Sequence, residues 1–400
     1  FSPNEAKDLY DAFGHENFDE LYEMYERKTS LKFKKTIKAR EMMSLFVKER
    51  VETGRIYFMN IDHCNQRSAW DDDIKMTNLC VEVLHPTKPL QHTDDKDAEI
   101  GICILSAINV LEIQSDAEME KVCDIIVRIL DQLIDYQDYF LPAAENFTKN
   151  RRSLGIGITN FAAYLAKAGV KYTDDEAPNV ADELMEKVQY YLLSSSCNIA
   201  SEKGKCPKYH KTKYSQGWLP IDTYKKEIDE FVTRKNSMDW EGLRERIKEH
   251  GLRHSTVSAI MPCESSSVIQ CSTNGIEPIR SYITYKKSKA RTLPVIVPNY
   301  SFLKNKYTLA YEMEDNVGLI KIVGALQKWV DMSISANMYY NYEHYENGAL
   351  PDSKVIKEIL LAYKLGWRTG YYNNTDDGDK QSSSGEEQSD NGCESGACAL

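Results

Sequence analysis

Residues 115–133, SDAEMEKVCDIIVRILDQL, are the stretch of this sequence that indicates the fold class most clearly. Ser115 and Glu118 form an S-x-x-E capping box, a pattern that predicts the start of a helix. Apolar residues then recur at spacings of three and four, which predicts one buried helix face; they are Met119, Val122, Ile126, Ile129, Leu130 and Leu133. Cys123 belongs to this face, so we expect it to pack in the core.

Outward from this helix, further helical patterns alternate with shorter extended segments, which is typical of an α/β protein. The spacing of apolar residues predicts helices over 179–197, 319–332 and 355–365, and a strand over 367–372. The last segment, residues 373–400, contains no aromatic residue and no Ile or Val. Such a segment buries too little surface to offset its ordering entropy, so we expect a mobile tail there.

The composition excludes several classes of protein. The chain has 400 residues, of which 42% are hydrophobic and 28% charged, as in ordinary soluble proteins of two or three domains. Its net charge of -11 argues against a protein that coats nucleic acid or anionic membrane. No apolar run approaches the ~20 residues of a membrane span, and residues 1–20 lack a signal-peptide core. Ten cysteines are too few for a disulfide scaffold, so we expect a reducing, cytoplasmic location.

The segment 76–83, MTNLCVEV, is the first candidate for chemistry. In an extended chain, Asn78, Cys80 and Glu82 would share one face. The pattern alone favours the simpler interpretation, a half-buried strand with a packing cysteine. The alternative is an amide, a thiol and a carboxylate aimed into one cavity. There the carboxylate would keep the thiol neutral, which suits hydrogen-atom transfer with Glu82 as general base better than nucleophilic attack.

Other segments carry weaker signals. Cys103 lies in an apolar stretch, where packing is the simpler role. The sequence from Pro262 through Cys263, Glu264, Ser265, Ser266 and Ser267 predicts the start of a helix, whose free N–H groups can face an anion. Such serine-rich caps are common, so this signal is weak by itself. The pair Gly155 and Gly157 lacks the third glycine of a dinucleotide fingerprint, and we reject that interpretation.

Cys393 and Cys398 stand out because they lie on a polar terminus that offers them no core to fill. A redox role is therefore expected. Metal-ligand patterns are poorly organised, since the eight histidines are scattered and neither HExxH nor C-x-x-C occurs. We predict no metal site in this chain. The adjacent Tyr371 and Tyr372 precede the expected tail.

Several short motifs occur in one order along the chain: TGRIY from Thr53, HCN from His63, NLCVE from Asn78, PTKP from Pro86, RSLGIG from Arg152, HGLR from His250, NGIEP from Asn274, YYN from Tyr371 and CESGAC from Cys393. In this order they resemble the large, catalytic subunit of a class I aerobic ribonucleotide reductase. The resemblance is collinear over essentially all 400 residues.

The resemblance implies roles for the residues of the candidate site. Cys80 would be the thiyl-radical cysteine that removes the 3′-hydrogen of the ribonucleotide. Glu82 would be the base on the 3′-hydroxyl, and Asn78 its hydrogen-bonding partner. Cys103 would be one of two thiols that reduce the 2′ position and become a disulfide. The loop 262–267 would cradle the diphosphate of a ribonucleoside diphosphate, with Cys263 where the family usually has Ser or Thr.

The resemblance also implies a route for electrons. Tyr371 and Tyr372 would relay a radical to Cys80 from a small subunit that holds a diiron-tyrosyl cofactor, so no cofactor is expected in this chain. Contact between the two rings would require an irregular backbone, because neighbours on a strand point to opposite faces. Cys393 and Cys398 would re-reduce the active-site disulfide and then be reduced by thioredoxin or glutaredoxin.

The implied fold is the second half of a ten-stranded α/β barrel with a central finger loop over residues 1–211. A smaller α/β domain would span 212–372, followed by a redox-active tail over 373–400. The first barrel half, which carries the effector site and the cysteine that pairs with Cys103, would belong to a preceding part of the subunit. We therefore expect either a truncated piece or a naturally split subunit that assembles with a separate N-terminal chain.

Three other interpretations are open to the same motifs. An anaerobic reductase stores its radical on a glycine near cysteines, and residues 395–397 lack that context. A cobalamin-dependent reductase would need no small subunit, but Tyr371 and Tyr372 argue against it. A non-catalytic fragment that only docks partners is the third, and the intact cysteines and carboxylate argue against it. Neither direct nucleic-acid binding nor membrane binding is expected.

Overall fold

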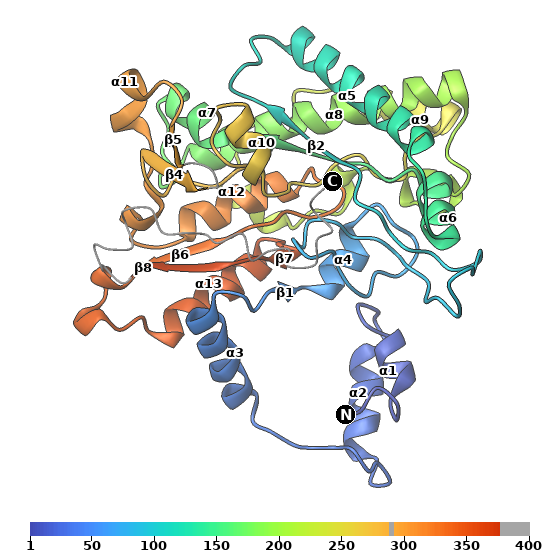
Figure 1. Cartoon of the computed structure of the whole chain (residues 1–400). Coiled ribbons are helices and arrows are strands. Elements are labelled where there is room, and N and C mark those ends of the chain that lie inside the picture. The colour runs from blue at the N-terminus through green and yellow to red at the C-terminus, as the bar shows by residue number, and fades with distance from the viewer. Residues whose placement is uncertain (288–291, 377–400) are drawn as a thin grey trace.

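The computed structural model describes residues 1–287 and 292–376 (Figure 1). The predicted redox residues Cys393 and Cys398 lie outside these ranges. Within them, helices and strands alternate as expected for an α/β protein. None of the helices in the described ranges combines the length and the apolar character needed to cross a membrane.

A row of parallel extended segments runs through the fold. Strand β2 (Leu105–Asn109) pairs in parallel with β3 (Gly155–Thr159). Backbone hydrogen bonds continue the row from β3 to residues 256–260, and from these to residues 332–336. The row brings together segments that lie far apart in the sequence.

The row ends in a second parallel pair. Strand β6 (Met338–Asn341) pairs with β8 (Asn373–Asp376), and the Tyr371 N–H donates to the Ala336 carbonyl at 2.8 Å. The tail predicted to begin at residue 373 is therefore wrong for the four residues of β8, because β6 takes up their backbone hydrogen bonds.

Two antiparallel pairs complete the described strands. They are β1 (Phe58–Met59) with β7 (Thr369–Gly370), and β4 (Ile283–Lys287) with β5 (Thr292–Ile296). Over residues 1–287 and 292–376, the named strands form four two-stranded sheets, and no sheet closes on itself.

Two glycines let the row pack closely. A Cβ atom on Gly157 would lie 2.7 Å from the Ala259 carbonyl oxygen, and one on Gly155 would lie 2.6 Å from Leu105 Cδ2. Both distances are too short for a side chain. These glycines therefore serve contact between neighbouring segments of the row.

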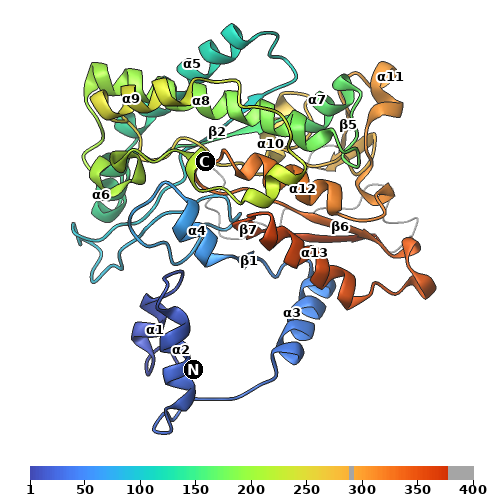
Figure 2. The ribbon, with the colours of Figure 1, turned by 180° about the vertical axis from the view of Figure 1, so that it is seen from behind.

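Helices α5, α8 and α9 lie together at the top of Figures 1 and 2, whereas α1, α2 and α3 extend below the rest of the fold. Their bounds, short 3₁₀ turns aside, are α1 Lys7–Asp11, α2 Phe18–Arg27, α3 Ala39–Thr53, α4 Ile61–Arg67, α5 Asp116–Tyr136, α6 Pro142–Arg151, α7 Phe161–Ala168, α8 Ala177–Lys203, α9 Trp240–His250, α10 Glu264–Ile269, α11 Tyr300–Leu303, α12 Val317–Gln327 and α13 Asp352–Lys364. The three helices predicted over 179–197, 319–332 and 355–365 correspond to α8, α12 and α13. Helix α12 ends earlier than predicted because residues 332–336 join the row.

Helix α5 confirms its predicted start and corrects its predicted face. The Ser115 hydroxyl accepts the Glu118 N–H at 3.2 Å, and Cys123 is fully buried. Ile129 and Leu133, predicted to be buried, keep 58% and 40% of their surface exposed. The helix carries two apolar stripes, and the buried one consists of Met119, Cys123, Val127, Leu130 and Ile134. The spacing of apolar residues does not determine which of the two stripes packs against the rest of the protein.

One hydrophobic core spans most of the chain. Its buried residues extend from Val47 to Trp367, and α8 packs against α5, α9 and α12. These contacts cross the boundary predicted between residues 211 and 212. The division into two domains at that point stays a prediction.

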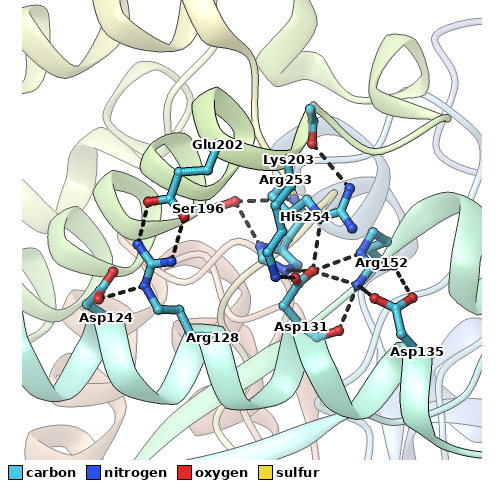
Figure 3. A network of polar contacts seen from close by, with 11 residues as sticks. Asp124, Arg128, Asp131, Asp135, Arg152, Ser196, Glu202, Lys203, Arg253 and His254 are labelled. Atoms are coloured by element: carbon cyan, nitrogen blue, oxygen red, sulfur yellow. Dashed lines mark hydrogen bonds and ion pairs between the residues drawn. The ribbon is translucent and has the colours of Figure 1, made fainter.

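A buried carboxylate ties α5 to two segments that lead into the row (Figure 3). Asp131, with no exposed side-chain surface, accepts hydrogen bonds from Arg152 at 2.6 Å and Arg253 at 3.0 Å. His254 at 3.2 Å and Lys203 at 3.0 Å complete its contacts. Burial opposes ionisation, but the His254 hydrogen bond and the cations hold the pKa of Asp131 well below its usual range.

We expect Asp131→Asn to lower the free energy of unfolding by about 3–5 kcal/mol, because the buried Arg152 and the partly buried Arg253 lose the fully buried counter-charge that they share. Asp135→Asn is the matched control. Asp135 lies on the same helix and also pairs with Arg152, but its side chain is 48% exposed, so we expect a loss below about 1 kcal/mol. Urea unfolding of both variants measures the difference. Equal losses would contradict a central role for Asp131.

Candidate active site

The segment 76–83 is a tight loop, so the predicted strand is wrong. Thr77 pairs with Leu84 in an isolated antiparallel bridge, and the chain turns between them. The Val81 N–H donates to the Asn78 carbonyl at 3.2 Å, and the Asn78 side-chain oxygen accepts the Val83 N–H at 3.0 Å. These turn hydrogen bonds take the place of a strand ladder.

Val81 has a left-handed backbone with a φ of 62°. This conformation is strained for a β-branched residue and persists only where the surroundings enforce it. Here three successive carbonyl groups of the loop accept hydrogen bonds from residues of the neighbouring row and of the segment beside it. The Ser335 hydroxyl lies 2.5 Å from the Cys80 carbonyl oxygen, the Thr369 hydroxyl 3.0 Å from that of Val81, and the Ser333 N–H 2.9 Å from that of Glu82.

The loop brings the predicted catalytic residues together. Asn78 Nδ2 lies 3.8 Å from Cys103 Sγ, and the Tyr371 hydroxyl lies 3.5 Å from Cys80 Sγ. Glu82 is 1% exposed and accepts a hydrogen bond from Ser335 at 3.1 Å. An amide, two thiols, a carboxylate and a phenol thus meet at one place. Cys80 itself is only partly buried.

Burial shifts two ionisable groups of this cluster, Glu82 and Cys103, towards their neutral forms. Burial raises the pKa of Glu82, and hydrogen bonds from Asn78 and Ser335 oppose the rise. Although Cys103 keeps an exposed side, partial burial of its thiol raises its pKa to about 11, and the Glu82 carboxylate adds to the shift. A neutral thiol beside a carboxyl group is a poor nucleophile but can donate a hydrogen atom.

Tyr371 and Tyr372 lie in contact, with ring centroids 4.2 Å apart at an interplanar angle of 55°. The backbone between β7 and β8 is irregular at these two residues, which confirms the irregularity expected for contacting rings. Tyr57, to which the sequence analysis assigned no role, is a third member. Its ring lies 4.7 Å from that of Tyr371 and 5.2 Å from that of Tyr372. Its only sequence signal is its place in the TGRIY motif.

A buried arginine holds this irregular backbone in place. Arg50 of α3 is fully buried, and its guanidinium donates to the Tyr371 carbonyl at 2.8 Å and to the Ile56 carbonyl. It also lies over the Phe58 ring, 5.1 Å from the centroid. Arg50 binds carbonyl groups at the point where the strand is interrupted. No sequence motif pointed to it.

Residues 262–267 do begin a helix, α10, as predicted. The Cys263 N–H donates to Asn274 Oδ1 at 2.6 Å, and its thiol faces the Met261 carbonyl with 2% of the residue exposed. Of the serines, Ser265 and Ser266 are exposed and Ser267 is buried; Glu264 is exposed as well. Because the Cys263 thiol is buried, backbone groups and the exposed serines of this loop can contact a ligand in its place.

The NGIEP motif links this loop to the tyrosine pair. Glu277 accepts hydrogen bonds from Asn337 at 2.5 Å and from the Tyr339 hydroxyl at 2.6 Å. Asn337 in turn accepts the Tyr372 N–H at 3.0 Å. Among residues 1–287 and 292–376, no three His, Cys, Asp or Glu side chains are grouped to hold a metal ion.

Comparisons with a family profile and with curated relatives point to the same family. The family profile described as "Ribonucleotide reductase, barrel domain" matches residues 1–317 and 299–373. The ribonucleoside-diphosphate reductase subunit alpha of Haemophilus influenzae is 45% identical over 405 residues, which cover 100% of this chain and 53% of the relative. The ribonucleoside-diphosphate reductase 1 subunit alpha of Escherichia coli is 47% identical over 407 residues, again covering 100% of this chain and 53% of the relative.

A viral protein is similar as well. The ribonucleoside-diphosphate reductase subunit alpha of Enterobacteria phage T4 is 39% identical over 388 residues, which cover 94% of this chain and 50% of the relative. The chain thus spans about half the length of the curated relatives it matches.

Alkylation of Cys103 will report the electrostatics of the site. With a pKa of about 11, its thiol should react about 100-fold more slowly at pH 8 than one at the usual value of 9.0. Glu82→Gln removes a negative charge, so labelling should become several-fold faster. Mass spectrometry of the Cys103 peptide after iodoacetamide treatment measures both rates.

Glu264→Gln, a change at an exposed carboxylate of α10, is the control and should leave the Cys103 rate unchanged. Labelling of the wild-type protein at pH 8 as fast as that of the unfolded chain would contradict the expected pKa.

Proposed function

We propose, from the premise that this chain belongs to the ribonucleotide reductase barrel-domain family, that it carries the catalytic site for radical-based reduction of ribonucleoside diphosphates. The observation that supports this most directly is the 3.5 Å contact between the Tyr371 hydroxyl and Cys80 Sγ. It joins a chain of phenols to a thiol whose neighbour on the loop is a buried carboxyl group.

In this proposal the Cys80 thiyl radical removes the 3′-hydrogen atom of the ribose and becomes a thiol, and the radical moves to the sugar. Glu82 takes the proton of the 3′-hydroxyl, and Asn78 binds the substrate by a hydrogen bond. The 2′-hydroxyl leaves as water after it gains a proton. Cys103 and a second thiol supply the two electrons and two protons of the reduction and become a disulfide. Cys80 then returns its hydrogen atom to the 3′ carbon and becomes a thiyl radical again, and Glu82 returns the proton to the 3′-hydroxyl.

The radical would reach Cys80 through Tyr372 and then Tyr371. The 4.2 Å separation of the two rings and the 3.5 Å step to sulfur support this order. Tyr57 contacts both rings and would fix their relative position. The radical itself would come from a diiron-tyrosyl cofactor in a small subunit. The contact between Tyr371 and Cys80 supports such a relay over a cobalamin-dependent radical source.

The row of parallel segments would be one half of a ten-stranded α/β barrel, and β2 would form its open edge. The chain covers about half of its relatives' length, so we propose that a further polypeptide supplies the other half and the cysteine that pairs with Cys103. That polypeptide would be either continuous with this chain or separate. Cys393 and Cys398 would then return the disulfide to thiols, with thioredoxin or glutaredoxin as the electron donor in the cytoplasm.

The start of α10 would hold the diphosphate of the substrate. Because the Cys263 thiol is buried, the contacts would come from backbone N–H groups and from the exposed Ser265 and Ser266. Asn274 holds the Cys263 N–H at the entry to this turn, and Glu277 connects the same loop to Asn337 beside the tyrosine pair.

Cys80→Ser tests the enzymatic role. We expect turnover below about one-thousandth of the wild-type rate, because an alcohol O–H bond is too strong to serve as the radical site. The measurement is deoxynucleotide formation by this chain assembled with the rest of the large subunit and the small subunit. Cys197→Ala, at a buried cysteine of α8, is the control and should keep most of the activity. Unimpaired turnover by Cys80→Ser would refute the proposed function.

Tyr372→Phe tests the radical route. The variant keeps the ring but loses the O–H group that is oxidised, so turnover should fall about as far as in Cys80→Ser while substrate binding is unchanged. The readouts are turnover and the equilibrium affinity for a ribonucleoside diphosphate. Tyr190→Phe on α8 is the control and should turn over normally. Full turnover by Tyr372→Phe would remove the relay from the mechanism.

A further inference from the structure

Ser335 occupies a position that the reaction chemistry described above does not use. Its hydroxyl lies 2.5 Å from the Cys80 carbonyl oxygen and 3.1 Å from Glu82 Oε2. The residue is 4% exposed and is fixed in the row by its own N–H, which donates to the Ile260 carbonyl at 2.9 Å. One rigidly placed hydroxyl therefore faces two acceptors on the loop that carries the candidate catalytic groups.

A hydroxyl has one hydrogen to donate, so it cannot serve both acceptors fully at once. When Glu82 is a carboxylate, the charge-assisted hydrogen bond to Oε2 is the stronger one. When Glu82 is protonated, its own O–H can donate to Ser335 Oγ, and the Ser335 hydrogen is available for the Cys80 carbonyl. The two protonation states of Glu82 thus favour two different hydrogen-bond patterns.

We propose that Ser335 is a positioning residue that links the protonation of Glu82 to the backbone of Cys80. The inference rests on the proposed function, in which Glu82 takes up the proton of a substrate hydroxyl. Arrival of that proton shifts the Ser335 hydrogen bond to the Cys80 carbonyl. The turn that holds the thiol is then fixed more firmly at the step at which the substrate carries the radical.

The hydrogen bond to the Cys80 carbonyl is important for the loop because the neighbouring residue, Val81, is strained. Cys80 precedes a residue held in a left-handed conformation with a φ of 62°, so the loop keeps its shape only while its carbonyl groups are bound. The Val81 and Glu82 carbonyls are bound by Thr369 and Ser333, whose contacts do not involve the Glu82 carboxyl group. Of the three hydrogen bonds, only the one from Ser335 responds to a proton.

The groups that face Glu82 come from several elements. Asn78 lies on its own loop, Ser335 comes from the row, and Cys103, whose pKa the Glu82 charge raises, lies just before β2. Cys80 and Tyr371 are in contact with each other close by. Burial favours the protonated form of Glu82, whereas the donors Asn78 and Ser335 favour the carboxylate and keep its pKa from rising further. Loss of the Ser335 hydroxyl removes a donor to the carboxylate, so the pKa of Glu82 should rise.

The test uses carbon NMR of this chain, with label in the glutamate side-chain carboxyl groups and in the cysteine carbonyl groups. Glu82→Gln identifies the Glu82 signal, and Cys80→Ser identifies the Cys80 carbonyl. In the wild-type protein the Cys80 carbonyl shift should follow the Glu82 titration. In Ser335→Ala the pKa of Glu82 should rise by about one pH unit, and the Cys80 carbonyl should no longer follow it.

Two further variants separate this link from simple support of the fold. Thr369→Val removes the hydroxyl at the Val81 carbonyl, so it should loosen the loop but leave the pKa of Glu82 unchanged. Ser335→Thr keeps a hydroxyl and should restore wild-type titration of both signals. The proposal would be overturned if the pKa of Glu82 were unchanged in Ser335→Ala. It would also be overturned if the Cys80 carbonyl shift of the wild-type protein did not change as Glu82 titrates. These readouts need no turnover, so failure of the reductase function would be seen separately.

Discussion

The geometry of the candidate site depends on one strained residue, Val81, and on the groups that hold it. A β-branched side chain in the left-handed region is unfavourable in isolation, so the loop cannot form this turn by itself. Ser333 and Ser335 come from one segment of the row, and Thr369 comes from the segment beside it. The site therefore forms only after segments more than 250 residues apart in sequence have packed side by side.

The tyrosine pair relies on a similar arrangement on the other side of Cys80. A regular strand would direct neighbouring rings to opposite faces, and here the ladder is interrupted between β7 and β8. Arg50 and Asn337 bind the backbone groups that the interruption leaves without a strand partner. Burial of Arg50 lowers its pKa to about 10, because the guanidinium gives up solvation to reach these carbonyl groups.

Sequence reasoning succeeded where local chemistry decides the structure and failed where distant contacts do. The Ser115 cap, the burial of Cys123 and the helix start after Pro262 follow from near neighbours and are confirmed. The alternation over 76–83 suggested a strand because it says nothing about turn hydrogen bonds or a left-handed valine. Asn78 and Cys103 lie in contact, and the catalytic roles predicted for Asn78, Cys80, Glu82 and Cys103 stay predictions. Arg50, Tyr57 and Ser335 were not predicted, because no spacing encodes contacts made across the whole chain.

The carboxylate at the centre of Figure 3 has a consequence for how this protein can change over generations. Asp131 is shared by Arg152, Arg253 and Lys203, each anchored on a different part of the chain. A substitution at Asp131 alone would remove one shared counter-charge from the buried Arg152, the partly buried Arg253 and the more exposed Lys203. Replacement of Asp131 during evolution would therefore require compensating replacements among these cations. The four positions are expected to change together rather than independently.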